Sequence, residues 1–180
     1  MMRQLSASEI AALKETAATI GARPESLYRL IAFESGWDPQ AKNPTSSARG
    51  LIQFIDATAR DLGFADSAEL VAQFPTVEDQ LLGPITTYLV QYGPYPDDQT
   101  LFMAVFYPAA MQWDPDREFP QWVKDANPGI NSPAEYMARV YQVQGMSDQD
   151  IRVAIKAGIG IAGIVLIAAA IGTVWYLSNS

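Results

Sequence analysis

The chain of 180 residues contains no cysteine and no histidine. Without cysteine it can form no disulfide and no thiolate nucleophile, and without histidine it can form no Ser–His dyad. The usual nitrogen and sulfur ligands of zinc are missing too, so we expect neither a metal site nor a cofactor. Carboxylates remain as the groups that could carry acid–base chemistry.

Basic residues are also scarce, because 12 Lys and Arg stand against 20 Asp and Glu and give a net charge of −8. Proteins that bind nucleic acid need Lys and Arg to neutralise phosphates, so we expect no nucleic-acid partner. All of these charged residues lie in the first 156 residues, a length that suits one domain with its own core.

The remaining end of the chain, residues 157–177, has no charge and almost no polar side chain. As a helix rising ~1.5 Å per residue, it would roughly match the hydrocarbon core of a bilayer. Trp175 and Tyr176 lie at its far end, where aromatic rings favour the membrane interface, and Lys156 directly precedes it. The pattern predicts a single transmembrane helix; the alternative is a buried helix of the preceding domain.

The first nine residues lack the apolar run of a secretion signal, so we expect no cleavable export signal. Ser6 and Glu9 instead have the spacing of a capping box, and Leu5 and Ile10 that of a hydrophobic staple. These features predict a helix that begins after Ser6.

Helical periodicity dominates the rest of the chain, which predicts a mainly α fold. The first helix should end at Gly21, and a second should run from Pro24 or Glu25 to about Glu34. Residues 38–49 are expected to form a loop, and a small hairpin within this loop is the alternative. Further helices are predicted at residues 51–62, after a short turn, and at 67–73, 77–92, 98–111 and 133–144.

Glu34 continues an apolar stripe on the second helix. The stripe consists of Leu27, Leu30 and Ile31. Burial can raise a carboxyl pKa by up to ~3–5 units, which would keep a glutamic acid protonated near neutral pH, as general acid catalysis requires. Judged by spacing alone, the other reading of Glu34 is a helix-end residue that faces water.

Four segments, in order along the chain, contain short motifs. Residues 34–41 have the sequence ESGWDPQA, and residues 48–63 have the sequence ARGLIQFIDATARDLG. These two segments resemble the Glu-Ser motif of the soluble lytic transglycosylase family and its Gly-Leu-Met-Gln and Pro-Ala-Thr-Ala stretch. Residues 104–110, AVFYPAA, resemble its Ala-Tyr-Asn-Ala-Gly motif with Asn and Gly replaced. Residues 135–140, EYMARV, resemble its final motif, a Tyr-Val pair followed by a basic residue and Val.

The resemblance covers about residues 10–145 and implies a lysozyme-like helical domain, which we assign to residues 1–146. It also implies that Glu34 first protonates the bond between N-acetylmuramic acid and N-acetylglucosamine in peptidoglycan glycan strands. The same carboxylate would then take a proton from the muramic C6 hydroxyl, which closes a 1,6-anhydro ring. The muramic N-acetyl group can replace a second protein carboxylate in such a scheme.

Further site residues follow from the same resemblance. Gln53 is expected to line the groove, although it could instead cap a turn. The Tyr136 hydroxyl should approach Glu34, although Tyr136 could also be a core aromatic residue. The resemblance adds Ser35 and Tyr107 as substrate-binding residues. Trp113 is predicted as a groove wall for a different reason, because it is an aromatic residue in a loop-like stretch.

Two aspartates lie close to Glu34 in sequence and are weighed as alternatives to it. Asp38 follows Gly36 and precedes Pro39, which makes a turn residue more plausible than a second catalytic acid. Asp56 stands where the family usually has Pro and is expected to cap the helix that follows it.

Two other functions and one cellular setting complete the predictions. The same fold and Glu34 would suit a hydrolytic muramidase of the goose-lysozyme type, or a membrane scaffold that binds glycan without cutting it. Residues 147–156 are assigned to a juxtamembrane linker, in which Arg152 and Lys156 favour the cytoplasmic side. We hypothesise a single-pass component of a bacteriophage virion, in contact with other virion proteins, that opens the host wall locally for DNA entry. It would be either carried in an internal viral membrane or ejected.

Overall fold

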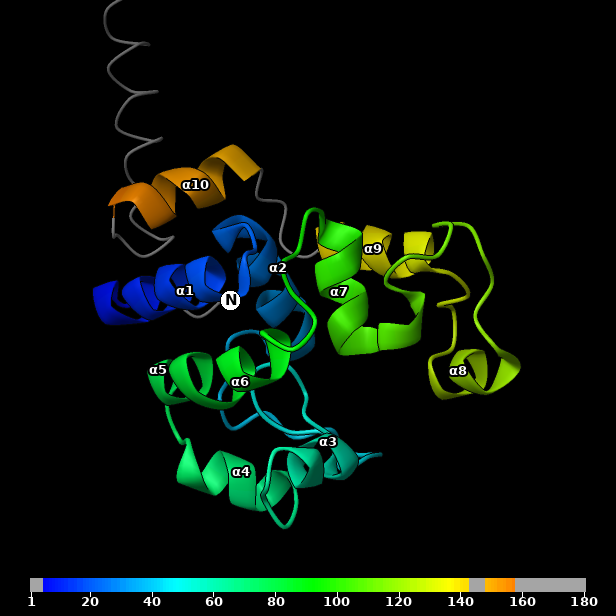
Figure 1. Cartoon of the computed structure of the whole chain (residues 1–180), viewed down its shortest axis with the longest axis horizontal. Coiled ribbons are helices and arrows are strands. Elements are labelled where there is room, and N and C mark those ends of the chain that lie inside the picture. Colours follow the sequence, from blue (N-terminus) through cyan, green and yellow to red (C-terminus); the bar gives the residue numbers. More distant parts are fainter. Residues whose placement is uncertain (1–4, 143–147, 158–180) are drawn as a thin grey trace, which may run out of the picture.

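The computed structural model describes residues 5–142 and 148–157, and these are mainly helical, as predicted. Within these ranges the extended pairings are two isolated bridges, Lys42 with Arg49 and Arg49 with Phe54. The elements, shown in Figure 1, are α1 Ala7–Ile20, α2 Pro24–Ser35, α3 Asp56–Asp61, α4 Ser67–Gln73, α5 Val77–Gln80, η1 Leu81–Ile85, α6 Thr86–Leu89, α7 Asp98–Phe106, η2 Pro108–Ala110, α8 Gln121–Ala126, α9 Pro133–Gln142 and α10 Asp148–Ala157.

Helix α1 begins and ends as its sequence predicts. The Ser6 amide donates to Glu9 Oε2 at 2.7 Å and the Glu9 amide donates to Ser6 Oγ at 3.2 Å, which is the predicted capping box. Leu5 and Ile10 are both buried. Gly21 ends the helix in the left-handed region, with φ at 72°, a conformation that glycine adopts without steric cost.

Helix α2 is the centre of the core. It contacts α1, α7, α9 and α10, which surround it in Figure 1. The predicted apolar stripe on α2 is buried, with Leu27, Leu30 and Ile31 fully inaccessible to water. A residue at the end of α2 is therefore fixed by a helix that is packed on several sides.

The helix expected over residues 77–92 is interrupted, so that prediction is wrong in its continuity. Gly83 has φ −97° and ψ −106°, and Pro84 lacks the amide that an uninterrupted helix would use. The Leu81 carbonyl near this kink accepts hydrogen bonds from Thr16 Oγ1 at 3.0 Å and Thr86 Oγ1 at 2.7 Å. These two hydroxyls compensate for the broken helical ladder.

The helix expected over residues 98–111 ends early, at Phe106. Pro108 disfavours helical geometry at the residue before it, and Tyr107 accordingly adopts φ −156° and ψ 88°. The chain continues as the short helix η2. Helix α8 was not predicted at all, because its six residues are too short for a clear apolar period.

Helix α10 forms most of the segment that the sequence suggests as a linker, residues 147–156. Its Ile151 and Ile155 are buried, and its Arg152 forms an ion pair with Glu25 of α2 at 2.8 Å. The predicted transmembrane helix at residues 157–177 lies, apart from its first residue, outside the described residues. Among the helices in residues 5–142 and 148–157, none combines the length and the apolar character needed to cross a bilayer.

Candidate active site

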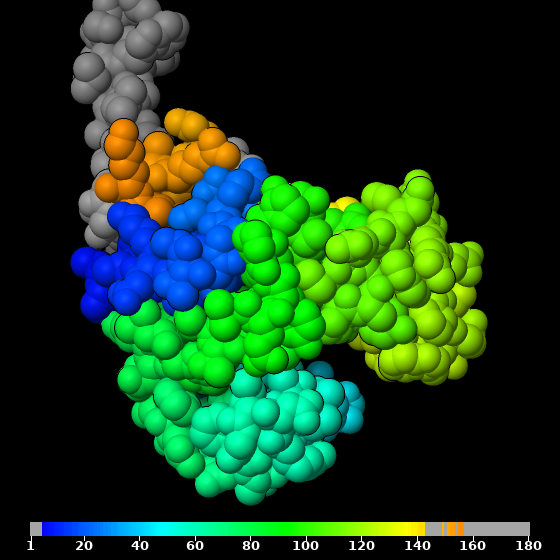
Figure 2. All heavy atoms as spheres, in the orientation of Figure 1, coloured from blue at the N-terminus to red at the C-terminus, as the bar shows by residue number. Residues whose placement is uncertain are grey.

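A cavity of about 930 Å³ opens at the end of α2. Residues of α3, α6, α7, the loop before α3 and the end of α8 form its walls. In Figure 2 the molecule is hollowed between the α3–α4 region and the α8 region, which is where these walls face each other. The polar lining consists largely of uncharged side chains, namely Asn43, Thr45, Ser46, Gln53, Thr58 and Asn127.

Glu34 lies in this cavity, in the last turn of α2. The side chain is half-buried, next to the cavity-lining Phe33. Loss of hydration disfavours the carboxylate and raises the pKa of Glu34 to about 7, although a hydrogen bond from Tyr136 acts in the opposite direction. At neutral pH the group is therefore present in both protonation states, so it can donate a proton and take one back.

Tyr136 donates this hydrogen bond to Oε1 of Glu34 from helix α9. Its ring is 1% exposed, stacks on Phe106 with centroids 4.3 Å apart, and meets the edge of Phe33 at 5.4 Å. Burial and the nearby Glu34 raise the pKa of Tyr136 well above its usual value, so the hydroxyl stays protonated and donates. The predicted approach of Tyr136 to Glu34 is present, and Tyr136 is a core aromatic residue as well.

Gln53 combines the two features expected of it. It lines the cavity, and its Nε2 donates to the Gly50 carbonyl at 2.9 Å, which closes the turn before α3. The backbone of Gln53 has a positive φ of 55°. A non-glycine residue in this conformation is held there by its surroundings.

Gln80, which the sequence did not single out, holds the same turn from behind. Its side chain is fully buried: Oε1 accepts from the Leu51 amide at 2.8 Å, and Nε2 donates to the carbonyls of Pro39 and Phe74 at 2.7 and 3.0 Å. One amide group thus fixes three chain segments, including the turn that carries Gln53. Its only sequence signal is a polar residue on an otherwise apolar helix face.

Three of the predicted substrate-binding residues do not line the cavity. Ser35 Oγ donates to the Ile31 carbonyl of its own helix at 3.1 Å. Tyr107 and Trp113 pack edge to face against each other, with centroids 5.7 Å apart. They belong to an aromatic cluster beside the cavity, which consists of Tyr107, Trp113, Phe119 and Trp122. The neighbours of Tyr107, Phe106 and Pro108, line the cavity instead.

The two aspartates weighed as alternatives to Glu34 also lie outside the cavity lining. Asp38 accepts from the Gln40 amide at 2.8 Å and is a turn residue, as predicted. Asp56 is not the expected cap, because α3 begins at Asp56 itself and its carboxylate accepts from the amide and hydroxyl of Ser67. These hydrogen bonds lower the pKa of Asp56 and join α3 to the start of α4.

Asp61 is the acid that lines the cavity together with Glu34, and sequence reasoning missed it. It is exposed on α3, three residues after Thr58, which lines the cavity too. Residues at this spacing share one face of a helix, so the spacing was the available signal. No group of three potential metal-binding side chains occurs in the part of the chain that the structure describes.

Comparison with known proteins bears on one part of this architecture. The family model of the transglycosylase SLT domain matches residues 11–85, and no curated protein matches the chain. The matched range includes Glu34, Gln53 and Asp61, whereas Tyr136 lies beyond it. An SLT domain implies lytic transglycosylase activity on peptidoglycan and supports the expected lysozyme-like character. The resemblance of the third and fourth motifs stays a prediction.

Proposed function

We propose that this chain cleaves the bond between N-acetylmuramic acid and N-acetylglucosamine in peptidoglycan, with Glu34 as its single catalytic carboxyl group. The observation that carries the proposal is the environment of Glu34. Its carboxyl group lies half-buried in the cavity, and loss of hydration there raises the pKa of Glu34 to about 7. The match of residues 11–85 to the SLT domain supports the reaction class.

In the first step, the protonated Glu34 gives its proton to the glycosidic oxygen as the bond from that oxygen to the muramic C1 breaks. Positive charge develops at C1, and the N-acetyl oxygen of the same sugar can stabilise it. The products are a free 4-hydroxyl on N-acetylglucosamine and an activated muramic residue. Tyr136 keeps Oε1 of Glu34 in place during this transfer.

In the second step, the Glu34 carboxylate takes the proton of the muramic C6 hydroxyl, and that oxygen bonds to C1. The 1,6-anhydro ring closes, and Glu34 returns to its protonated form. The same group acts first as acid and then as base, so a pKa close to the working pH serves both steps.

Hydrolysis is the second candidate, and the presence of Asp61 in the cavity lining favours it. A second carboxylate could orient a water molecule against C1, as the base does in inverting glycosidases. The products decide between the reactions, because transglycosylation leaves anhydromuramic ends, whereas hydrolysis leaves reducing ends. Asp61→Asn would abolish hydrolysis but should change transglycosylation by less than about threefold, because that reaction uses Glu34 alone.

The test of the proposed role of Glu34 is the digestion of purified peptidoglycan by the whole chain and by Glu34→Gln, with mass spectrometry of the released fragments. We expect anhydromuramic fragments from the unchanged chain and a loss of at least about 10³-fold in the variant, as for removal of an essential acid–base group. Glu15→Gln, an exposed position on α1, is the matched control and should retain full activity. Equal activity of Glu34→Gln would exclude the proposed role.

A scaffold that binds glycan without cutting it is separated by the same experiment. Such a protein would retain peptidoglycan in a pull-down and release no fragments, with or without Glu34. The raised pKa of Glu34 supports catalysis over a scaffold role. Glycan binding alone does not require a group that can donate a proton near neutral pH.

The cellular setting is a proposal that rests on the sequence. We propose that residues 157–177 anchor the enzyme in a membrane and that it belongs to a bacteriophage particle that penetrates the cell wall locally. Fractionation should recover the chain with membranes after an alkaline wash. Immunodetection should find it in purified particles, and its absence from them would exclude the virion assignment.

A further inference from the structure

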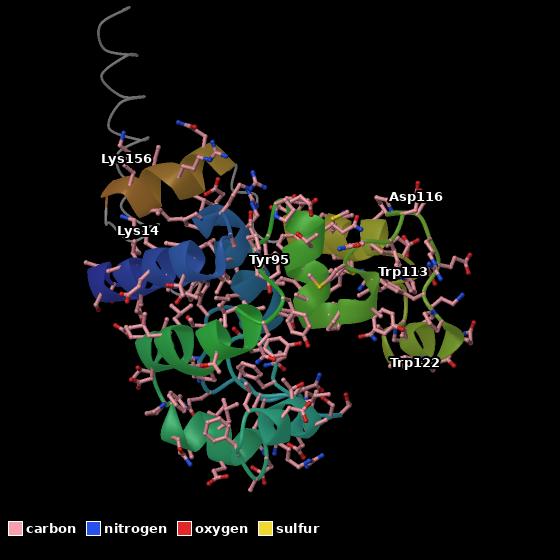
Figure 3. The ribbon with its side chains drawn as sticks, viewed as in Figure 1. Lys14, Tyr95, Trp113, Asp116, Trp122 and Lys156 are labelled. Atoms are coloured by element: carbon pink, nitrogen blue, oxygen red, sulfur yellow. The ribbon has the colours of Figure 1, made fainter. Side chains whose placement is uncertain are left out.

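Trp122 presents an exposed indole ring on α8, where Figure 3 labels it. The side chain is 64% exposed, more than any other large apolar side chain in the described part of the chain. Such exposure loses the free energy that burial of a tryptophan would provide, and the indole leaves a large apolar face with one N–H group open to a ligand.

The position of Trp122 on α8 connects it to the cavity. Ala126, four residues later on the same helix, lines the cavity, as does Asn127 at the end of the helix. Residues four apart lie on one face of a helix, about 6 Å from each other. Trp122 itself is outside the cavity lining, so its side chain lies one helical turn from the point where α8 meets the cavity.

The ring is also held in place by the aromatic cluster. Trp122 meets Tyr107 in an edge-to-face arrangement with centroids 5.7 Å apart, and Tyr107 makes further edge-to-face contacts with Trp113 and Phe119. A ring fixed by such contacts loses little conformational entropy when a ligand stacks on it. This arrangement gives Tyr107 and Trp113 a supporting function outside the cavity.

A hydrogen-bond acceptor lies at the end of the same helix, in the cavity lining. Asn127 Nδ2 donates to the Val123 carbonyl at 2.9 Å, so its Oδ1 can accept from a hydroxyl or an acetamido N–H at the cavity wall. An aromatic face and a neutral acceptor suit the pyranose ring of N-acetylglucosamine, whose faces carry C–H groups and whose rim carries hydroxyl and acetamido groups. An anionic ligand would need Lys or Arg side chains, whereas this lining holds the carboxyl groups of Glu34 and Asp61.

We infer that Trp122 is a stacking platform for a sugar unit of the same glycan strand, outside the position where the bond is cut. The inference rests on the proposed function for the identity of the strand. It predicts that the chain distinguishes long from short glycans, because only a strand that extends past Ala126 reaches the indole ring.

The test measures binding of N-acetylglucosamine oligomers of two to six units by calorimetry, with every chain carrying Glu34→Gln to prevent cleavage. Trp122→Ala should weaken binding of the longest oligomer roughly three- to tenfold, as expected for the loss of one aromatic contact. The affinity for the shortest oligomer should be unchanged. Trp122→Phe, which retains a ring, should recover most of the affinity. Leu82→Ala, which removes an exposed apolar side chain outside the cavity lining, should bind as the parent does.

Several outcomes would overturn the inference. One is an unchanged affinity of Trp122→Ala for the longest oligomer. Another is a loss of affinity in Trp122→Ala that is equal at every oligomer length. A third is a loss of affinity in Leu82→Ala as large as that in Trp122→Ala. If Trp122→Ala does not fold, Trp122→Gln, which removes the aromatic face but keeps a long side chain, is measured in its place and decides by the same length dependence. A loss of affinity that does not increase with oligomer length also overturns it.

The catalytic proposal fails or survives independently of this result. Oligomer binding needs no cleavage, so an inactive chain would exclude the proposed function and still report on Trp122. In a chain that retains Glu34, Trp122→Ala should raise KM for long glycans and leave kcat unchanged, as loss of uniform binding does. A fall in kcat with unchanged KM would contradict the platform role.

Discussion

The hydroxyl of Tyr136 donates a hydrogen bond to Oε1 of Glu34 across 102 positions of sequence. The bond joins α9 to the last turn of α2, where Glu34 lies in the cavity lining. It stabilises the carboxylate, whereas loss of hydration stabilises the neutral acid and is the larger effect. The balance of these two influences determines the pH at which Glu34 can exchange a proton.

Tyr136→Phe should shift that balance while preserving the ring that stacks on Phe106. Without the hydroxyl, nothing opposes desolvation, so the pKa of Glu34 should rise above about 7. The pH profile of kcat/KM should move to higher pH, and the maximal rate should fall roughly 10- to 100-fold because a hydrogen bond to a charged group is lost. A profile that keeps its position would contradict this role of Tyr136.

Glu34→Gln should make the folded chain more stable at high pH. The folded pKa of about 7 exceeds the ordinary value of 4.5, so the folded state binds more protons and stability declines as the pH rises between these values. A neutral glutamine avoids this decline and should add up to roughly 3 kcal/mol at pH 8, and little at pH 4. Urea unfolding at the two pH values measures the difference, and equal effects at both would count against a desolvated Glu34.

Asp98 should make the fold sensitive to acid. Burial raises its pKa, but hydrogen bonds from Ser26, Tyr141 and Arg23 outweigh burial and lower it. A lowered carboxyl pKa gives stability that is present above the ordinary value and is lost as the pH falls through the folded value.

Asp98→Asn should therefore destabilise the chain at pH 6 by roughly 2–4 kcal/mol, because Arg23 loses its partner and the network is broken. The variant should also lose less stability than the unchanged chain between pH 5 and pH 2.5. Asp97→Asn, which affects the neighbouring exposed cap of α7, is the control. An identical acid response in Asp98→Asn and the unchanged chain would exclude this network as the acid-sensitive element.

Gln80→Ala should weaken both the fold and the reaction. It removes three hydrogen bonds and leaves the buried Leu51 amide and two partly buried carbonyls without their partner, which should cost roughly 2–4 kcal/mol. The turn that carries Gln53 loses its support, so activity should fall even at temperatures where the chain stays folded. Gln73→Ala, at an exposed position on α4, should change the unfolding temperature and activity very little.

Local patterns in the sequence predicted much of the core of this fold. The capping box at Ser6 and the apolar stripe that ends at Glu34 depend on residues within one or two turns, and the structure retains both. The break at Pro84 was visible in the sequence as well, but the apolar period across it suggested a continuous helix. A proline within such a period should have been taken as a kink.

Long-range contacts were beyond the reach of residue spacing. The support that Gln80 gives to the turn before α3 depends on how distant segments pack, as does the location of Asp61 in the cavity. The proximity of Tyr136 to Glu34 came from the family resemblance and not from periodicity. Tyr107 and Trp113 were predicted to bind substrate in the groove. Helix α7 ends before Pro108, however, and the two side chains pack against each other in the aromatic cluster beside the cavity.

Direct titration of the Glu34 carboxyl group tests the central claim most closely. The carboxyl carbon can be followed by carbon-13 NMR across the pH range, and its resonance can be assigned by its disappearance in Glu34→Gln. We predict a midpoint at about 7, the consequence of lost hydration in the cavity. A midpoint near the ordinary value of 4.5 would contradict the proposed mechanism, because Glu34 would then hold no proton to give at neutral pH.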